Sequence, residues 1–271
     1  MARSFYDVLG DAVNDIAEHG YDKEERIAYW SDLLRKAAKR YFTKAQTEKI
    51  LRDHLQAIYR RMVINNGVTK YHKGVSKFTI AKVKPKLRAE LDRRIMASAN
   101  LIQLNRDEMI EKTIRRFQGW STSVPVGGLR ADTGKAQAKK DVYKALSQRP
   151  FTERRVLIDQ GHKLVSSIND IVATDAGALG AIWHSNWREI NYNYRPEHKQ
   201  RDGVFYPIRN NWAIEKGLMK PNGHKYLDEI DQPAEKPYCR CFAQYVYNIV
   251  SVPKDMLTTK GKEVIDTVNA L

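Results

Sequence analysis

Residues 195–241 read RPEHKQRDGVFYPIRNNWAIEKGLMKPNGHKYLDEIDQPAEKPYCRC, and this stretch decides how the rest of the chain is interpreted. It contains both cysteines of the chain and two of its seven histidines. A histidine, an Asp-Gly turn, several prolines and a Cys-x-Cys motif within so short a span favour a compact, cross-linked substructure. We therefore expect the other residues to present this module to partners.

The two cysteines are candidate metal ligands. Cys239 and Cys241 are too few for a disulfide framework, and their i,i+2 spacing would strain a mutual disulfide. On an extended strand both side chains point to one face, where two thiolates can hold one ion. Zinc prefers four nitrogen or sulfur ligands, which His198 and His224 would complete, and His184 is a third candidate histidine. The alternative interpretation is two small buried residues beside surface histidines.

Positive charge is concentrated in the N-terminal half of the chain. The formal net charge is +15, and residues 1–150 carry 31 Lys or Arg against 17 Asp or Glu. Residues 60–94 alone carry 11 basic and 2 acidic residues. So localised a field favours a polyanion such as nucleic acid or an acidic protein surface, while the alternative is a solvated helix face. The candidate phosphate contacts are Arg60, Arg61, Lys70, Lys73, Lys82, Lys84, Lys86 and Arg88.

Helical spacing of apolar residues dominates the first half. Asp22 with Glu25 has the spacing of a capping box that starts one helix, and Thr43 with Gln46 has the spacing that starts the next. Pro85 is expected to start a third helical region that continues to Gly119, as one long helix or two collinear ones.

Two segments interrupt these helices. Residues 68–84 alternate lysine with β-branched or aromatic residues, which predicts a lysine-rich hairpin or a loop that orders on a partner. Residues 119–134, GWSTSVPVGGLRADTG, contain four glycines and a proline and predict a loop or linker. The glycine spacing before Lys135 does not match a phosphate-binding loop, and Ala136 stands where that loop needs Ser or Thr.

The motif order in the C-terminal half resembles a known family. Arg195-Pro196-x-His198, then Asp202-Gly203-x-Phe205, then Cys239-Arg240-Cys241, is similar to the C-terminal signature of phage Mu F-like head morphogenesis proteins, the minor head proteins of tailed phages. The segments RRFQGWSTSVPVGG and FTERRVLIDQGHKLVSSINDIVATDAGALGAIWHSNW resemble proteins of the same group. The likeness covers about residues 115–250. It implies a role in head assembly near the portal, without established catalysis.

Four residues of this signature are expected to be structural. Asp202 and Gly203 predict a turn before a short strand, because glycine accepts a positive φ without strain. Arg195 and Arg240 are expected to pair with Asp202 or Glu197 and so connect the ends of the module.

These observations predict a predominantly helical α+β fold with an extended N-terminal helical half and a small C-terminal α+β module. We expect a basic helical region over residues 1–118, a loop or linker over residues 119–134 and the module over residues 135–271. Neither a signal peptide nor a membrane span is predicted.

The function expected from these features is that of a structural minor head protein. It would dock on portal or major capsid protein and form an oligomer around the portal, with or without a bound zinc ion. Its basic half would contact packaged DNA. Its expected location is the virion head, and the host cytoplasm during assembly. The alternatives are a metal-dependent nuclease or other enzyme delivered with the genome, with His198 or His224 as base, and a plain DNA-binding protein.

Overall fold

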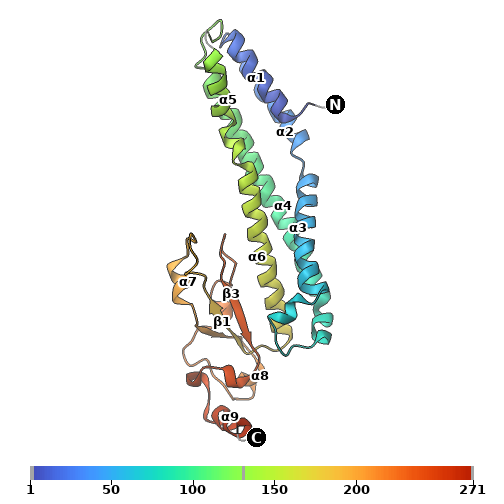
Figure 1. Ribbon diagram of the computed structural model, residues 1–271, viewed down its shortest axis with the longest axis vertical. Helices are drawn as coiled ribbons and strands as arrows, with labels where there is room; N and C mark the ends of the chain where they lie inside the picture. Colours follow the sequence, from blue (N-terminus) through green and yellow to red (C-terminus); the bar gives the residue numbers. More distant parts are fainter. Residues whose placement is uncertain (1–2, 130–131, 270–271) are drawn as a thin grey trace. The chain divides into compact units, whose positions relative to one another are not determined.

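The computed structural model describes residues 3–129 and 132–269, and these form a predominantly helical α+β protein with one small antiparallel sheet (Figure 1). The long helices are α1 (Phe5–His19), α2 (Glu24–Tyr41), α3 (Lys44–Tyr59), α4 (Lys77–Ser121), α5 (Asp132–Ser147) and α6 (Arg149–Asp175). The sheet and the short helices that follow are β1 (Gly180–His184), α7 (Pro196–Gln200), β2 (Phe205–Pro207), α8 (Trp212–Glu215), β3 (Phe242–Val246) and α9 (Thr259–Asn269). The predicted fold class is confirmed.

The chain divides into two compact units that are interleaved in sequence. The first unit, unit 1, comprises residues 1–52 and 95–157, and unit 2 comprises residues 53–94 and 158–271. This division differs from the predicted boundaries at residues 118 and 135. The reason is that α3, α4 and α6 are continuous helices that each contribute residues to both units.

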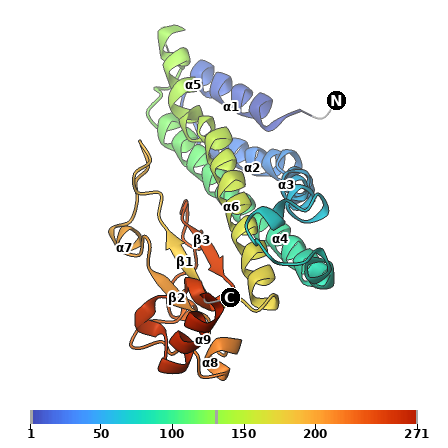
Figure 2. The same cartoon turned by 60° about the horizontal axis from the view of Figure 1, so that its bottom comes forward.

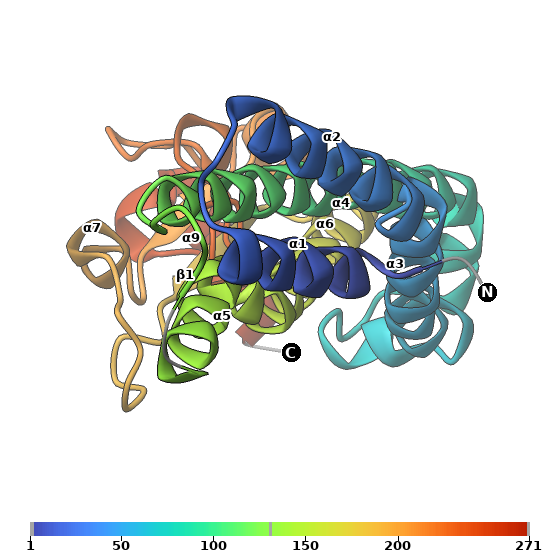
Figure 3. The same ribbon diagram turned by 90° about the horizontal axis from the view of Figure 1, so that it is seen from above.

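Unit 1 is a helical bundle. Helix α1 packs between α2 and α5 (Figure 3), and Ser4 begins it with a capping box in which the hydroxyl accepts from the Asp7 N–H. The core contains Leu9 from α1, Leu34 from α2 and Phe117 from α4, all without exposed surface. Apolar residues that recur every three or four positions place these side chains on inward faces.

The predicted start of α2 is wrong in detail. Lys23 occupies the N-cap position and makes no side-chain capping bond. Asp22 instead accepts two hydrogen bonds from the guanidinium of Arg26, at 2.8 and 3.0 Å. An arginine within reach offers the carboxylate a charge-assisted partner, which replaces the capping interaction.

The glycine-rich segment is a loop, as predicted, but its backbone is tied to α1. The Gly127 N–H donates to the His19 carbonyl and the Leu129 N–H to the Ala17 carbonyl, at 3.0 and 2.8 Å. Gly128 has φ +84°, and a Cβ there would lie 2.2 Å from the Glu18 carbonyl oxygen. This close approach requires glycine.

Residues 68–84 form no hairpin. A short 3-10 helix, Gly67–Lys70, and a turn lead into α4, which begins at Lys77 and contains Pro85 in its interior. Ser76 determines this early start, because its Oγ accepts a hydrogen bond from the Thr79 N–H at 3.1 Å. The apparent alternation also contained a helical spacing, since Ile80 and Val83 share the buried face of α4.

Unit 2 contains the sheet, whose strand order is β2-β1-β3, with both pairs antiparallel. Ala181 of β1 lies opposite Tyr206 of β2 and Tyr245 of β3. One face of the sheet packs around Trp183, and the other packs against α8 and α9 (Figure 2). Cys239 and Cys241, which were expected on an extended strand, lie just before β3, because β3 begins at Phe242.

Candidate metal centre

His198, Cys239 and Cys241 converge in the core of unit 2. The Nδ1 atom of His198 lies 3.5 Å from each cysteine Sγ, and the three potential ligand atoms all lie within 4.8 Å of one another. The three residues are buried, with exposed fractions of 1%, 1% and 4%. One nitrogen and two sulfur atoms in this arrangement form a donor set that suits zinc or another soft divalent ion.

Local structure brings the histidine to the cysteines. Pro196 is the first residue of α7, where the missing N–H costs nothing, and His198 is the third residue of this helix. The indole of Trp183, on β1, packs edge-on against the imidazole with 5.2 Å between ring centroids. The cysteines come from the segment just before β3. Three separate segments of unit 2 therefore build the site.

Hydrogen bonds hold the cysteine segment in place from both sides. The Asp159 carboxylate accepts from the Tyr238 N–H at 2.6 Å, and the Tyr192 hydroxyl accepts from the Arg240 N–H at 3.0 Å. The guanidinium of Arg195 donates to the Pro237 carbonyl at 3.0 Å. These bonds fix the backbone on either side of Cys239, so the thiols are positioned before any ion binds.

The two arginines of the signature have other partners than predicted. Arg240 forms an ion pair with Glu189 at 2.6 Å, and Arg195 binds a backbone carbonyl rather than Asp202 or Glu197. Each arginine still connects the segment before α7 to the cysteine segment. The pairing could not be predicted because residues 195–241 alone contain seven Asp or Glu residues, and Glu189 lies just before them.

The two thiols share their protons unequally. A hydrogen bond from the Cys241 thiol lowers the pKa of Cys239 to about 5, although burial opposes this. The same hydrogen bond, together with burial, raises the pKa of the Cys241 thiol. These opposite shifts favour a proton shared between the two sulfurs, and a metal ion bound by both would displace it.

The other nitrogen of His198 distinguishes this site from the usual metal-bound histidine. Its Nε2 is buried and has no hydrogen-bond partner among the described residues. Metal-bound imidazoles usually donate from the second nitrogen to a carbonyl or carboxylate. Here packing against Trp183, rather than such a bond, orients the ring.

His224 and His184 lie outside the cluster, so the predicted four-residue ligand set reduces to three residues. His224 is exposed, and its Nε2 lies 2.7 Å from the Asp255 carboxylate. His184 stacks on Phe242 with 4.9 Å between centroids, and its Nε2 lies 3.0 Å from the Gln244 side-chain oxygen. Sequence spacing alone did not separate these histidines from His198.

Asp202 and Gly203 form the turn between α7 and β2. Asp202 accepts from the Ser185 N–H at 2.8 Å and from the Trp187 indole N–H at 2.9 Å, and the first of these bonds is the main cause of its lowered pKa. Gly203 has φ +79° and donates its N–H to the Trp183 carbonyl at 2.8 Å. Both residues therefore serve the backbone that surrounds the cluster.

The predicted phosphate contacts all lie on the surface of unit 2. Each of the eight side chains is exposed, and residues 60–89 contain nine Lys or Arg and no Asp or Glu. Lys86 pairs with Asp175 at 2.7 Å and Arg88 with Asp92 at 3.2 Å. Within residues 3–129 and 132–269 the remaining cations of this run form no ion pair. We call them the basic surface: Arg60, Arg61, Lys70, Lys73, Lys77, Lys82 and Lys84.

A buried histidine beside this surface was not predicted. The exposed fraction of His72 is 1%, and its Nε2 lies 3.1 Å from Oδ1 of Asn169, while the Tyr247 hydroxyl bonds its Nδ1. The ring also stacks on Tyr245. Burial lowers the pKa of His72, so the neutral form is favoured. In sequence it stands among lysines, and nothing there distinguishes it from a surface histidine.

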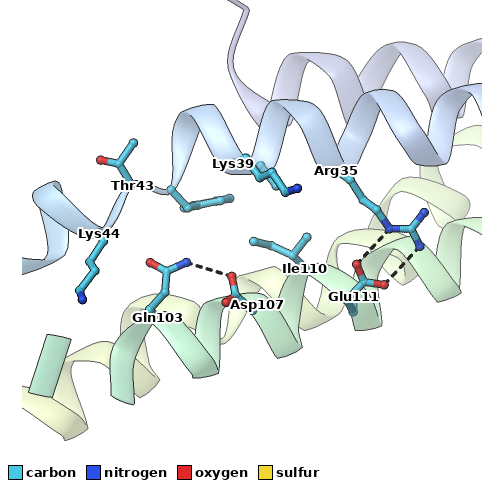
Figure 4. Close-up of a pocket in the computed structure, with 10 residues that line it drawn as sticks. Arg35, Lys39, Thr43, Lys44, Gln103, Asp107, Ile110 and Glu111 are labelled. Carbon is cyan, nitrogen blue, oxygen red and sulfur yellow. Dashed lines mark hydrogen bonds and ion pairs between the residues drawn. The ribbon is translucent and has the colours of Figure 1, made fainter. Parts of the chain in front are cut away.

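A separate groove lies in unit 1, between α2 and α4 (Figure 4). Its volume is about 500 Å³, and Phe42 and Ile110 contribute to its apolar lining. Arg35 and Glu111 form an ion pair across it at 3.1 Å. The ten residues known to line it include no histidine or cysteine. This groove therefore offers less chemistry than the cluster in unit 2.

No helix in the described ranges combines the length and apolar character needed to cross a membrane. The likeness to Mu F-like proteins stays a prediction, because comparison of the chain with known families, curated proteins and solved structures finds no match in any of the three.

Proposed function

We propose that this chain is a structural protein of a tailed-phage head that contacts nucleic acid through its basic surface. The observation that carries the proposal is the run of exposed, unpaired cations within residues 60–84 of the described chain, in a stretch without any acidic residue. Free lysines and arginines release counterions when they meet phosphates, which drives binding without sequence preference. An internal ion-pair network would have used these charges within the protein.

The salt dependence of binding tests this proposal. If all seven cations of the basic surface meet phosphates, the slope of log K against log salt is about −6 for duplex DNA. The variant Lys82→Glu/Lys84→Glu should weaken binding and make the slope less steep by about 2. The variant Lys220→Glu/Lys225→Glu is the matched control, since both lysines are exposed, belong to unit 2 and lie outside the basic surface. Affinity independent of salt would contradict phosphate contact.

The proposed role of the metal centre is structural, with zinc as the ion. His198, Cys239 and Cys241 would hold zinc at the point where three segments of unit 2 meet. The bound ion supplies cross-linking free energy that this small sheet would otherwise lack. The burial of all three ligands supports a staple over a site that exchanges substrates.

Zinc content tests the ligand set. Purified protein should contain one zinc ion per chain, and either Cys239→Ser or His198→Ala should abolish it. His224→Ala is the control, because His224 lies outside the cluster and should leave the zinc content unchanged. Protein that folds normally with a zinc ratio near zero would remove the idea.

The resemblance to Mu F-like proteins, over about residues 115–250, supports docking on portal or capsid protein, oligomerisation around the portal and a location in the virion head. The test is co-assembly of purified protein with a portal ring, or its presence at low copy in finished particles. Absence from both would refute the head-protein proposal, whatever the result with DNA.

A metal-dependent hydrolase is the second candidate, because only three protein ligands are present among the described residues. Catalytic zinc sites usually have three protein ligands and one open position. Plasmid incubated with the protein and divalent metals distinguishes the candidates. Cleavage that is lost in His198→Ala would favour the enzyme.

A further inference from the structure

Two aromatic side chains lie exposed among the cations of the basic surface. The exposed fraction of Tyr71 is 54% and that of Phe78 is 78%. Tyr71 stands between Lys70 and Lys73 in sequence, and Phe78 directly follows Lys77. Single exposed apolar residues are common, but aromatic rings interleaved with unpaired cations are what binding sites for single-stranded nucleic acid combine.

The position of Phe78 on α4 places its ring beside cations and away from the core. It lies in the first turn of the helix, one turn before Lys82, so the two side chains share a face. Ile80 and Val83 occupy the buried face. The ring therefore contributes little to the packing of unit 2.

Tyr71 is presented by a fixed backbone. Its N–H donates to the Val68 carbonyl at 3.0 Å, and the next residue is the buried His72. His72 is hydrogen-bonded to Asn169 of α6 and to Tyr247, just after β3. A ring held by such an anchored turn loses little conformational entropy when a ligand stacks on it.

We propose that the basic surface binds single-stranded nucleic acid, with bases stacked on Tyr71 and Phe78 and phosphates held by the flanking lysines. This inference rests on the proposed nucleic-acid contact and makes it more specific. In a duplex the faces of the bases are covered by their neighbours, so exposed rings gain nothing from stacking. A single strand offers free base faces and the same phosphates, and stacking tolerates any sequence.

Fluorescence anisotropy with labelled oligothymidylate and a duplex of equal length tests the inference. Wild-type protein should bind the single strand more tightly at equal salt. Phe78→Ala and Tyr71→Ala should each weaken single-strand binding by roughly tenfold or more and leave duplex binding unchanged. Phe78→Trp should retain binding, whereas Phe78→Leu should lose it, because leucine keeps apolar area but cannot stack.

Exposed aromatics of unit 1 provide matched controls. Phe151→Ala and Tyr29→Ala remove rings of similar exposure, 59% and 61%, outside the basic surface and should have no effect. Unchanged circular dichroism and melting temperature verify that every variant folds.

The outcomes separate this inference from the broader proposal. If Phe78→Ala binds the single strand as wild type does, while Lys82→Glu/Lys84→Glu does not, stacking is refuted and phosphate contact survives. Binding of neither nucleic acid refutes both. If Phe78→Ala instead impairs only association with a portal ring, the rings belong to a protein interface and the stacking inference is overturned.

Discussion

Replacing His72 with alanine should destabilise unit 2 by about 3 kcal/mol. Two hydrogen bonds, to Asn169 and Tyr247, would be lost at about 1 kcal/mol each. Removing an imidazole that is 1% exposed and stacked on Tyr245 adds about 1 kcal/mol of lost packing. His72→Phe keeps a ring and loses only the hydrogen bonds, so its expected cost is about 2 kcal/mol.

Urea unfolding followed by tryptophan fluorescence measures these differences. With a slope of roughly 2 to 3 kcal/mol/M, the midpoint of His72→Ala should fall by about 1 M. His162→Ala is the matched control, because this histidine is exposed on α6 and its loss should change the free energy of unfolding by less than about 0.5 kcal/mol. Equal midpoints for the two alanine variants would refute the role assigned to His72.

The same residue predicts a pH dependence. Burial lowers the pKa of His72 below its ordinary 6.5, so the unfolded chain binds this proton more readily than the folded chain does. The stability of wild-type protein should therefore be fully present above the ordinary pKa and should fall as the pH drops below it. His72→Phe should lack this component. Parallel stability curves for wild type and His72→Phe across that window would contradict the assignment.

Three further changes have definite expected outcomes. Burial raises the pKa of Asp170, despite a hydrogen bond from Tyr245. Stability is therefore lost as the pH rises through the pKa that Asp170 has in the folded chain. Asp170→Asn removes this ionisation and should raise the urea midpoint at neutral pH. Arg106→Met should lower the free energy of unfolding of unit 1, measured in urea, by about 3 kcal/mol. The Arg106 guanidinium lies 2.6 Å from the Glu153 carboxylate, which the substitution leaves without a cation. A chelator should lower the melting temperature of zinc-loaded protein, which corresponds to about 4 kcal/mol if free zinc had been a thousandfold above Kd, and should not affect Cys239→Ser.

The long amphipathic helices could be predicted from sequence because one interaction, burial of an apolar face, determines them. Leu34 in α2 and Leu87 in α4 each belong to a series of apolar residues at helical intervals, and these residues are buried in the structure. The start of α4 could not be predicted in this way. Pro85 is a common first residue of helices, but the hydroxyl of Ser76 caps the helix nine residues earlier and outweighs that preference.

The candidate metal centre was predictable in its cysteines and in one histidine. Spacing put Cys239 and Cys241 together, and the turn at Asp202 kept His198 close in the chain to β2. His224 is nearer to Cys239 in sequence than His198 is, yet it pairs with Asp255 at the surface. Contacts between residues far apart in sequence decide such cases, and no local pattern encodes them.

Residues 53–94 and 158–271 belong to one compact unit, and this has a consequence during synthesis. Unit 1 has all its residues once Leu157 leaves the ribosome, whereas the first part of unit 2 must wait for the rest of its partners. During that interval residues 53–94, which include the apolar residues Ile80, Val83 and Leu87 of α4, lack the remainder of their unit. The lysines and arginines of residues 60–89 would then keep the nascent chain soluble before they contact any partner.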